Sequence, residues 1–125
     1  MTKAEEFDKA WRLAIHKVDF SLFDQIVHHD YETSNLGVKI NKEDSKALLA
    51  ARSGVAEMGP YRTIYEDEKF LCIHRFSRLY GGDLYISMIS AVMYKEGKVI
   101  TQETVREEID NDPSDGQDWN WENFK

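Results

Sequence analysis

Cysteine is almost absent from this sequence, and its scarcity limits what can hold the fold together. The 125 residues include one cysteine, Cys72, which has no partner within the chain. An internal disulfide is therefore excluded, and a reducing, cytoplasmic compartment is expected. A lone cysteine within a strand pattern is more typical of a small buried apolar side chain than of a nucleophile.

Clustered basic residues and long apolar runs are missing as well. Sixteen Lys and Arg against 23 Asp and Glu give a formal net charge of −7, which argues against a general nucleic-acid surface. No apolar run approaches the length of a membrane span, and the first residues lack the core of a signal peptide. We therefore expect neither nucleic acid nor a membrane as a partner.

The composition that remains is that of one globular domain with a short extension. A hydrophobic fraction of 42% and an aromatic fraction of 12% suffice for a packed core in a chain of this length. Residues 1–110 carry helix and strand patterns and are predicted to form the domain. Residues 111–125 are acidic and aromatic and are predicted to form a separate C-terminal tail.

Three helical segments are predicted in the first half of the chain, from capping residues and from apolar stripes at helical period. Their starts are marked by Thr2, Asp19 and Asn41. Gly59-Pro60 then interrupts helical structure, and residues 61–65 read as a strand.

Two hairpin turns organise the second half. Tyr80-Gly81-Gly82-Asp83 and Lys95-Glu96-Gly97-Lys98 divide residues 69–108 into three antiparallel strands. Helices followed by a strand meander predict an α+β fold, in which a curved, mostly antiparallel sheet folds over the helices and encloses one pocket.

The turns also predict which side chains share a face of the sheet. Two-residue turns would place Ile89 between His74 and Thr104 on neighbouring strands, and we expect this face to line the pocket. A bulge at Gly97 would move Arg106 to the other face, because one residue of slip exchanges the two faces of a strand.

The opposite face, which carries Leu71, Ile73 and Ile86, is apolar too. The helices of a small domain can cover only one face, and an exposed apolar sheet face is a liability in a monomer. We predict a homodimer formed through the outer sheet face. The alternative is that the helices and the tail together cover both faces.

The order of elements resembles the NTF2-like superfamily, which includes SnoaL-like polyketide cyclases and ketosteroid isomerases. The resemblance covers nearly all of residues 3–110. It rests on Asp19 between two helices, on His29-Asp30-Tyr31 after the second helix, and on Tyr94-Lys95-Glu96-Gly97-Lys98-Val99 before the last strand. It implies a cystatin-like cone, with three N-terminal helices packed on a curved sheet around a ligand pocket.

The same resemblance argues against ketosteroid isomerase chemistry. Trp11 stands where those isomerases have an oxyanion-hole tyrosine, Asn35 where they have the base aspartate, and Ile89 where they have a protonated aspartic acid. Asn35 cannot take up a proton at neutral pH, and Ile89 cannot donate a hydrogen bond. What the resemblance still implies is that these three residues line the cavity.

His74 and Arg106 are the candidate catalytic groups on the predicted pocket face. An imidazole can act as acid or base near neutral pH, and a guanidinium can hold an anionic or carbonyl oxygen. Each could instead be a core residue with a structural partner.

An apolar pocket with few polar groups is typical of a site for a small hydrophobic, oxygenated ligand. The predicted ligand-binding residues are Trp11, Tyr31, Asn35, His74, Phe76, Ser87, Ile89, Met93, Gln102 and Arg106.

The run His28-His29-Asp30 contains potential metal ligands. Neighbouring residues of a strand point to opposite faces, which makes shared ligation of one ion difficult. The C-terminus of a helix favours cationic side chains, and this explains the two histidines more simply. We predict no metal site and expect no cofactor.

The acidic tail contains Trp119, Trp121 and Phe124, which are costly to leave in water because a large aromatic side chain buries roughly 150–250 Å² when packed. We expect the tail to fold back on its own dimer, over the cavity mouth. The alternative is a docking motif for another protein.

Three functions stay open at this point. The first is a SnoaL-like small-molecule-binding protein, with or without catalysis of its own. The second is a non-catalytic homodimeric association module, and the third is a protein that stores or protects a ligand. An open, polar-tipped cavity would favour the first, and a cavity filled by side chains would favour the second.

Overall fold

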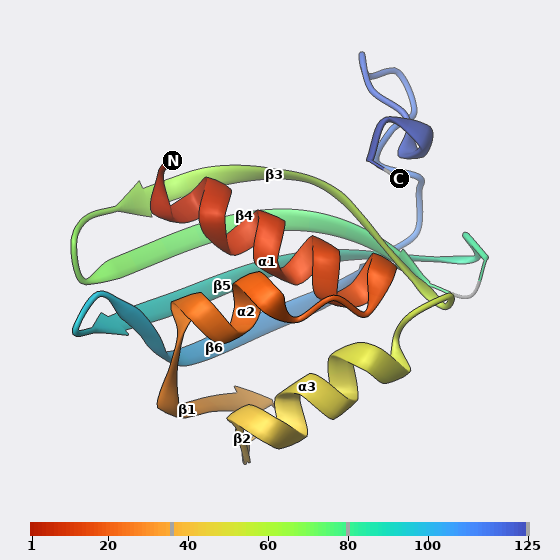
Figure 1. Ribbon diagram of the computed structural model, residues 1–125. Coiled ribbons are helices and arrows are strands. Elements are labelled where there is room, and N and C mark those ends of the chain that lie inside the picture. Colours follow the sequence, from red (N-terminus) through yellow and green to blue (C-terminus); the bar gives the residue numbers. More distant parts are fainter. Residues whose placement is uncertain (36, 80, 125) are drawn as a thin grey trace.

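The computed structural model describes residues 1–35, 37–79 and 81–124 and shows helices packed on one curved sheet (Figure 1). In chain order the elements are α1 (Lys3–Lys17), α2 (Ser21–Ile26), β1 (Val27–Asn35), β2 (Val38–Asn41), α3 (Lys42–Ala51), β3 (Ala56–Glu66), β4 (Phe70–Leu79), β5 (Leu84–Lys95), β6 (Lys98–Ile109) and the 3-10 turn η1 (Trp121–Phe124). Within the described residues, no helix is long and apolar enough to cross a membrane.

The helices begin close to where their capping residues predict. Thr2 and Glu5 form a capping box at α1, and the side chain of Asn41 caps α3. The start of α2 differs by one residue, because Phe20 is its N-cap and Asp19 instead accepts a hydrogen bond from the second residue after it. The expectation of three N-terminal helices is only partly met, since α2 has six residues, against fifteen in α1 and ten in α3.

The sheet is mixed and has the strand order β2-β1-β6-β5-β4-β3. All neighbouring strands run antiparallel except β1 and β6, which are parallel. The edge strand β3 is longer than predicted, since it begins at Ala56 and continues through Gly59-Pro60. An edge strand tolerates proline because its outward N–H has no ladder partner to lose, and the β3–β4 register shifts between Met58 and Tyr61.

The pairing of the three meander strands confirms one predicted register and corrects the other. The first hairpin pairs His74 with Ile89, as expected. The second turn has two residues, with Lys95 opposite Lys98. An extra residue, Ile100, then shifts β6 by one position, so that Ile89 lies opposite Val105 instead of Thr104.

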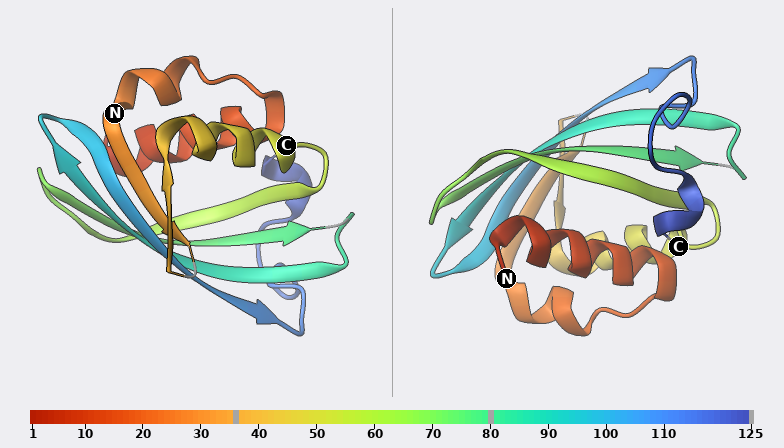
Figure 2. Two further views of the ribbon diagram at one scale, coloured as in Figure 1. Left: turned by 90° about the horizontal axis from the view of Figure 1, so that it is seen from below. Right: turned by 90° about the horizontal axis from the view of Figure 1, so that it is seen from above.

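The helices cover the sheet face opposite to the one predicted. All of them lie on one side of the curved sheet (Figure 2), and Leu71, Ile73 and Val92 are fully buried against them. The face expected to line the pocket is therefore the outer face in β4 and β5. Alternation identifies two faces of a strand, but with both faces apolar it does not say which one the helices cover.

Aromatic side chains connect the helices to the sheet in the core. The rings of Phe7 and Trp11 stack with centroids 4.1 Å apart, and Phe23 lies 4.9 Å from Trp11 and 6.3 Å from Tyr31. Such pairs add roughly 0.5–1.5 kcal/mol each beyond the area they bury. They hold Trp11 and Tyr31 in place above the sheet.

The C-terminal tail packs on its own chain, at the end of the sheet where β6 finishes (Figure 1). Trp121 is 5% exposed and lies against Gly59, where an added Cβ would come within 2.9 Å of the Trp121 ring. Arg12 donates hydrogen bonds to the carbonyl oxygens of Met58 at 2.7 Å, Gly59 at 3.0 Å and Phe124 at 3.2 Å. The described tail residues line no part of the space between the helices and the sheet, so the tail does not lie over a cavity there as expected.

Candidate functional site

A cavity lies between the helices and the inner face of the sheet, in two adjoining compartments. Their volumes are about 60 Å³ and about 100 Å³. Five side chains line both compartments and so mark their junction: Trp11, Arg52, Gln102, Thr104 and Arg106. We refer to the two compartments together as the inner cavity.

Strand β6 supplies three of the junction residues because of its shifted register. After the extra residue Ile100, every second side chain turns toward the helices, which brings Gln102, Thr104 and Arg106 to the inner face. Arg52 reaches the junction from the C-terminal end of α3, where it is the capping residue.

A short hydrogen-bond network fixes the polar groups at one side of the junction. The hydroxyl of Tyr31 donates to Gln102 Oε1 at 3.0 Å, and Gln102 Nε2 donates to Thr104 Oγ1 at 3.1 Å. The Ser90 and Thr104 hydroxyls lie 2.9 Å apart. Burial raises the pKa of Tyr31 to about 12, so its phenol stays protonated at neutral pH and acts as a donor.

Three arginines line the inner cavity. Arg52 and Arg106 stand at the junction, and Arg75 lines the larger compartment. Burial, together with the charge of Arg106, lowers the pKa of Arg52. Burial also lowers the pKa of Arg75, and the nearby Asp8 carboxylate opposes that shift.

Asp8 is shared between two arginines. Its Oδ1 lies 2.8 Å from Arg75 Nη1 and 3.0 Å from Arg12 Nη2. The contact with Arg75 is an ion pair that lacks the alignment of a hydrogen bond, and Arg75 Nη2 has no hydrogen-bond partner among the described residues. The nearby His16 accepts the Met58 N–H at Nε2, and burial lowers the pKa of His16 in favour of this neutral form.

The structure divides the predicted ligand-binding residues between the two faces of the sheet. Trp11, Tyr31, Gln102 and Arg106 lie at the inner cavity. The side chain of Asn35 lies outside the described residues. The others were predicted to share the pocket and instead lie on the outer face: His74, Phe76, Ser87, Ile89 and Met93.

His74, the candidate catalytic histidine, is thus remote from the other candidate, Arg106. Its Nε2 lies 2.7 Å from Ser87 Oγ in a shallow hollow of the outer face. Burial and the charge of Arg62 lower the pKa of His74, which favours the neutral ring at pH 7. The geometry gives His74 a hydrogen-bonded surface position.

Sequence reasoning did not select Arg52 and Arg75 as site residues. Arg75 lies two residues after Ile73 and so shares its face, which the sequence predicts to be the outer one, and the corrected face assignment moves both inward. The sequence does contain a signal for Arg75, because it stands at an apolar-face position of an alternating strand. An ionised side chain is rarely buried without a partner, so an arginine at such a position indicates a paired or functional group. Nothing in the local pattern marks Arg52.

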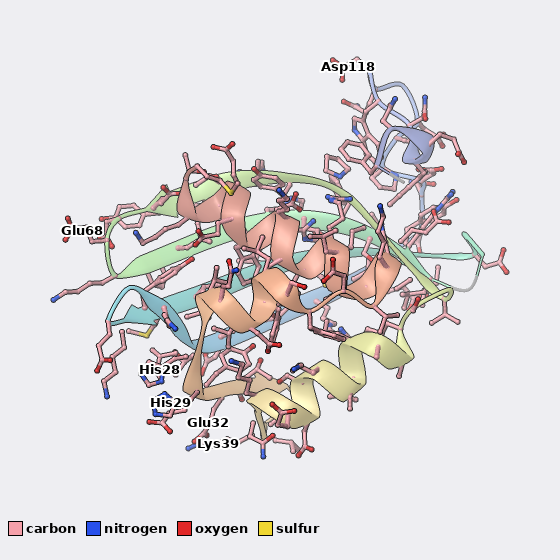
Figure 3. The ribbon with its side chains drawn as sticks, in the orientation of Figure 1. His28, His29, Glu32, Lys39, Glu68 and Asp118 are labelled. Atoms are coloured by element: carbon pink, nitrogen blue, oxygen red, sulfur yellow. The ribbon has the colours of Figure 1, made fainter. Side chains whose placement is uncertain are left out.

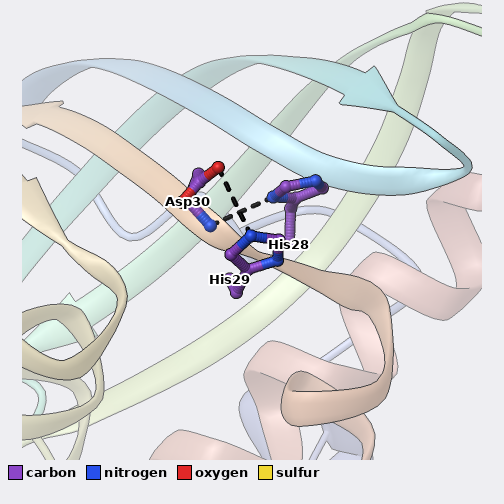
Figure 4. Close-up of side chains that lie close together, drawn as sticks. All are labelled: His28, His29 and Asp30. Carbon is purple, nitrogen blue, oxygen red and sulfur yellow. Dashed lines mark hydrogen bonds and ion pairs between the residues drawn. The ribbon is translucent and has the colours of Figure 1, made fainter.

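His28, His29 and Asp30 gather at the start of β1 (Figures 3 and 4). One ligand atom of each lies within 4.8 Å of the others, and the two rings stack 4.3 Å apart, so the neighbouring histidines do not point to opposite faces as expected. The β1–β6 register shift after Val27 explains this irregular start. His28 Nδ1 accepts the Asp30 N–H at 3.0 Å, and its Nε2 lies 3.7 Å from a Glu96 carboxylate oxygen.

Comparisons of sequence give no relatives, since neither a protein-family model nor a curated protein matches the chain. Comparison of structures gives several. An NTF2-like protein from Anabaena variabilis has a TM-score of 0.68 at 10% identity, over 83% of this chain and 86% of its own.

Two similar structures carry the names of enzymes. A steroid delta-isomerase from Pseudomonas aeruginosa has a TM-score of 0.64 at 15% identity, over 83% of this chain and 78% of its own. An LEH-like epoxide hydrolase from M. tuberculosis has a TM-score of 0.58 at 17% identity, over 80% of this chain and 79% of its own. At these identities the likeness is one of fold.

Proposed function

Because the chain has the fold of NTF2-like proteins, we propose that it binds a small molecule with an apolar body in the inner cavity. This proposal rests on the kinds of side chain that line the inner cavity. Apolar side chains such as Phe7, Trp11 and Met58 surround a few fixed polar groups, as is usual for small-molecule sites. The two compartments are similar in scale to a cavity of about 150 Å³ that accommodates benzene.

The chemistry of the lining favours binding over acid–base catalysis. Among the described lining residues there is no carboxylate or imidazole that could exchange a proton near pH 7. Tyr31 has a pKa of about 12 and is committed to Gln102 as a donor. A SnoaL-like binding protein that holds its ligand without transforming it fits this set of groups best.

Filling the inner cavity should abolish binding without disturbing the fold. We expect benzene-sized probes (benzyl alcohol, benzamide and benzoate) to shift the indole N–H resonance of Trp11 in ¹H–¹⁵N correlation spectra. The resonances of Trp119 and Trp121 should stay in place, because those side chains pack in the tail. Thr104→Phe, at the junction of the compartments, should remove the shift.

The matched control is Thr101→Phe, the same substitution on the same strand but at an exposed position that lines no part of the inner cavity. This variant should bind the probes like the wild type. Absence of any Trp11 shift in the wild type, with all three probes, would contradict the proposed function.

We further propose that two copies associate through the outer face of the sheet. Ile89 on β5 and Val105 on β6 lie directly opposite each other and are 45% and 73% exposed, and Met93 is 53% exposed. An apolar group of this kind on a sheet face is typical of an interface.

Val105→Lys is expected to convert a dimer into a monomer in sedimentation equilibrium, because it places a charge at the centre of this group. Val55→Lys is the control, since Val55 is 43% exposed in the segment between α3 and β3, away from the outer face. A wild-type protein that sediments as a monomer would contradict the proposed association.

A further inference from the structure

The inner cavity concentrates positive charge in a chain whose formal net charge is −7. Arg52, Arg75 and Arg106 line it, and the described lining residues include no Asp or Glu. Guanidinium groups that share a partly desolvated space repel one another, because the interior screens charge less well than water does. Such a space favours an anion.

Arg75 provides the strongest sign that a partner is missing. Arg75 is 5% exposed, and its side chain lines the larger compartment. Asp8 approaches Nη1, but Nη2 is buried with no hydrogen-bond partner in the described part of the chain. Buried donors of a charged group are costly to leave unpaired, so an acceptor inside the cavity would lower the free energy of this arrangement.

Arg52, which is half-buried, and Arg106, which is more exposed, bring two further positive charges to the junction. Neither guanidinium forms an ion pair or a hydrogen bond with any residue that the structure describes. The two lie near enough for the charge of Arg106 to lower the pKa of Arg52. A single negative group between them would offset this repulsion and accept hydrogen bonds from both.

We infer that the ligand of the inner cavity is a small organic carboxylate, whose carboxylate group faces the three arginines and whose apolar body packs against Trp11 and Met58. The planar guanidinium fork matches a carboxylate with two parallel hydrogen bonds, which a neutral oxygen cannot accept as strongly. The small volume of the compartments limits the apolar body to about the size of one ring. This inference rests on the proposed function and adds the chemical class of the ligand.

Titration calorimetry with benzoate and with its neutral analogue benzamide tests the inference. We expect wild-type protein to bind benzoate at least about tenfold more tightly than benzamide, the difference that one charge-assisted hydrogen bond supplies. Arg106→Gln should reduce benzoate affinity by about the same factor and leave benzamide affinity unchanged. The side chain of Arg106 is exposed enough that this variant should fold normally.

Arg62→Gln is the matched control, because Arg62 is an exposed arginine on β3 that borders the outer hollow and not the inner cavity. It should bind benzoate like the wild type. Inorganic phosphate should bind far more weakly than benzoate, since it has no apolar body.

The outcomes separate this inference from the proposed function. Equal affinities for benzoate and benzamide, or unchanged benzoate affinity in Arg106→Gln, would overturn the carboxylate assignment while leaving small-molecule binding intact. Equal affinity for phosphate would also overturn it, because the site would then be a general anion site. If neither aromatic probe bound, both the inference and the proposed function would be wrong.

Discussion

Replacing Asp8 by asparagine is expected to lower the free energy of unfolding by about 3–5 kcal/mol, the usual cost of removing one partner from a buried ion pair. The asparagine side chain would have nearly the same shape as the aspartate but no charge. Arg75, with a side chain 6% exposed, would lose its only described ion-pair partner, and Arg12 would lose its ion pair as well. The loss is large because the Arg75 guanidinium is buried away from bulk solvent.

Urea unfolding followed by circular dichroism measures this effect, with Asp24→Asn as the control. Asp24 also contacts two cations, Lys42 and Lys46, but its side chain is 46% exposed. Its loss should therefore cost less than about 1 kcal/mol. The Asp8→Leu, Arg75→Met double variant should recover most of the stability, because no buried charge is left unpaired. Equal losses in Asp8→Asn and Asp24→Asn would show that the ion pair is unimportant.

Trp121→Ala is expected to cost about 3–5 kcal/mol as well, and to release the tail from the domain. The Trp121 ring lies against Gly59, 6.2 Å from the ring of Tyr85 and 4.9 Å from the Arg78 guanidinium, and its Nε1 donates to Asp112 at 3.0 Å. No other tail residue in the described part of the chain is buried to this degree. Removing the ring leaves a cavity at the point where the tail meets β3.

Hydrogen exchange followed by mass spectrometry should show faster exchange in residues 110–124 of this variant, and chemical denaturation gives the loss of stability. Gly59→Val approaches the same contact from the other side and should release the same segment, because its side chain would collide with the Trp121 ring and the Phe76 carbonyl. Trp119→Ala removes a half-buried ring and should have a smaller effect. Unchanged exchange in Trp121→Ala would mean that the tail is held elsewhere.

Features set by local chemistry could be predicted from the sequence. Capping residues such as Thr2 and Asn41 and the glycine-containing turns act within a few positions, so their patterns identify element starts and hairpins directly. Because these local patterns also establish the order of helices and strands, the α+β fold class could be predicted from them. The extra residue at Ile100 has no comparable local signature, and it decides which way the side chains of β6 point.

The prediction of Gln102 and Arg106 as site residues shows how two errors can cancel. The predicted inner face of the sheet is in fact the outer one, and the register of β6 differs from the prediction by one residue. Each error alone would place a β6 side chain on the wrong face, and the two together place it on the correct one. Both residues lie at the inner cavity, whereas His74 was affected by the first error alone and lies outside. The grouping of Arg75 with Asp8 was beyond sequence reasoning, because α1 meets β4 only through the tertiary fold.

The contacts along β3 have a consequence for the exposed edge of the sheet. An unpaired edge strand can recruit a strand from another molecule, and β3, with eleven residues, is one edge of the sheet. Pro60 offers no donor there, Trp121 covers Gly59, and the Met58 and Gly59 carbonyls already accept hydrogen bonds from Arg12. We therefore expect the part of the edge from Met58 to Pro60 to resist pairing with a foreign strand, because Arg12 and the tail already occupy it.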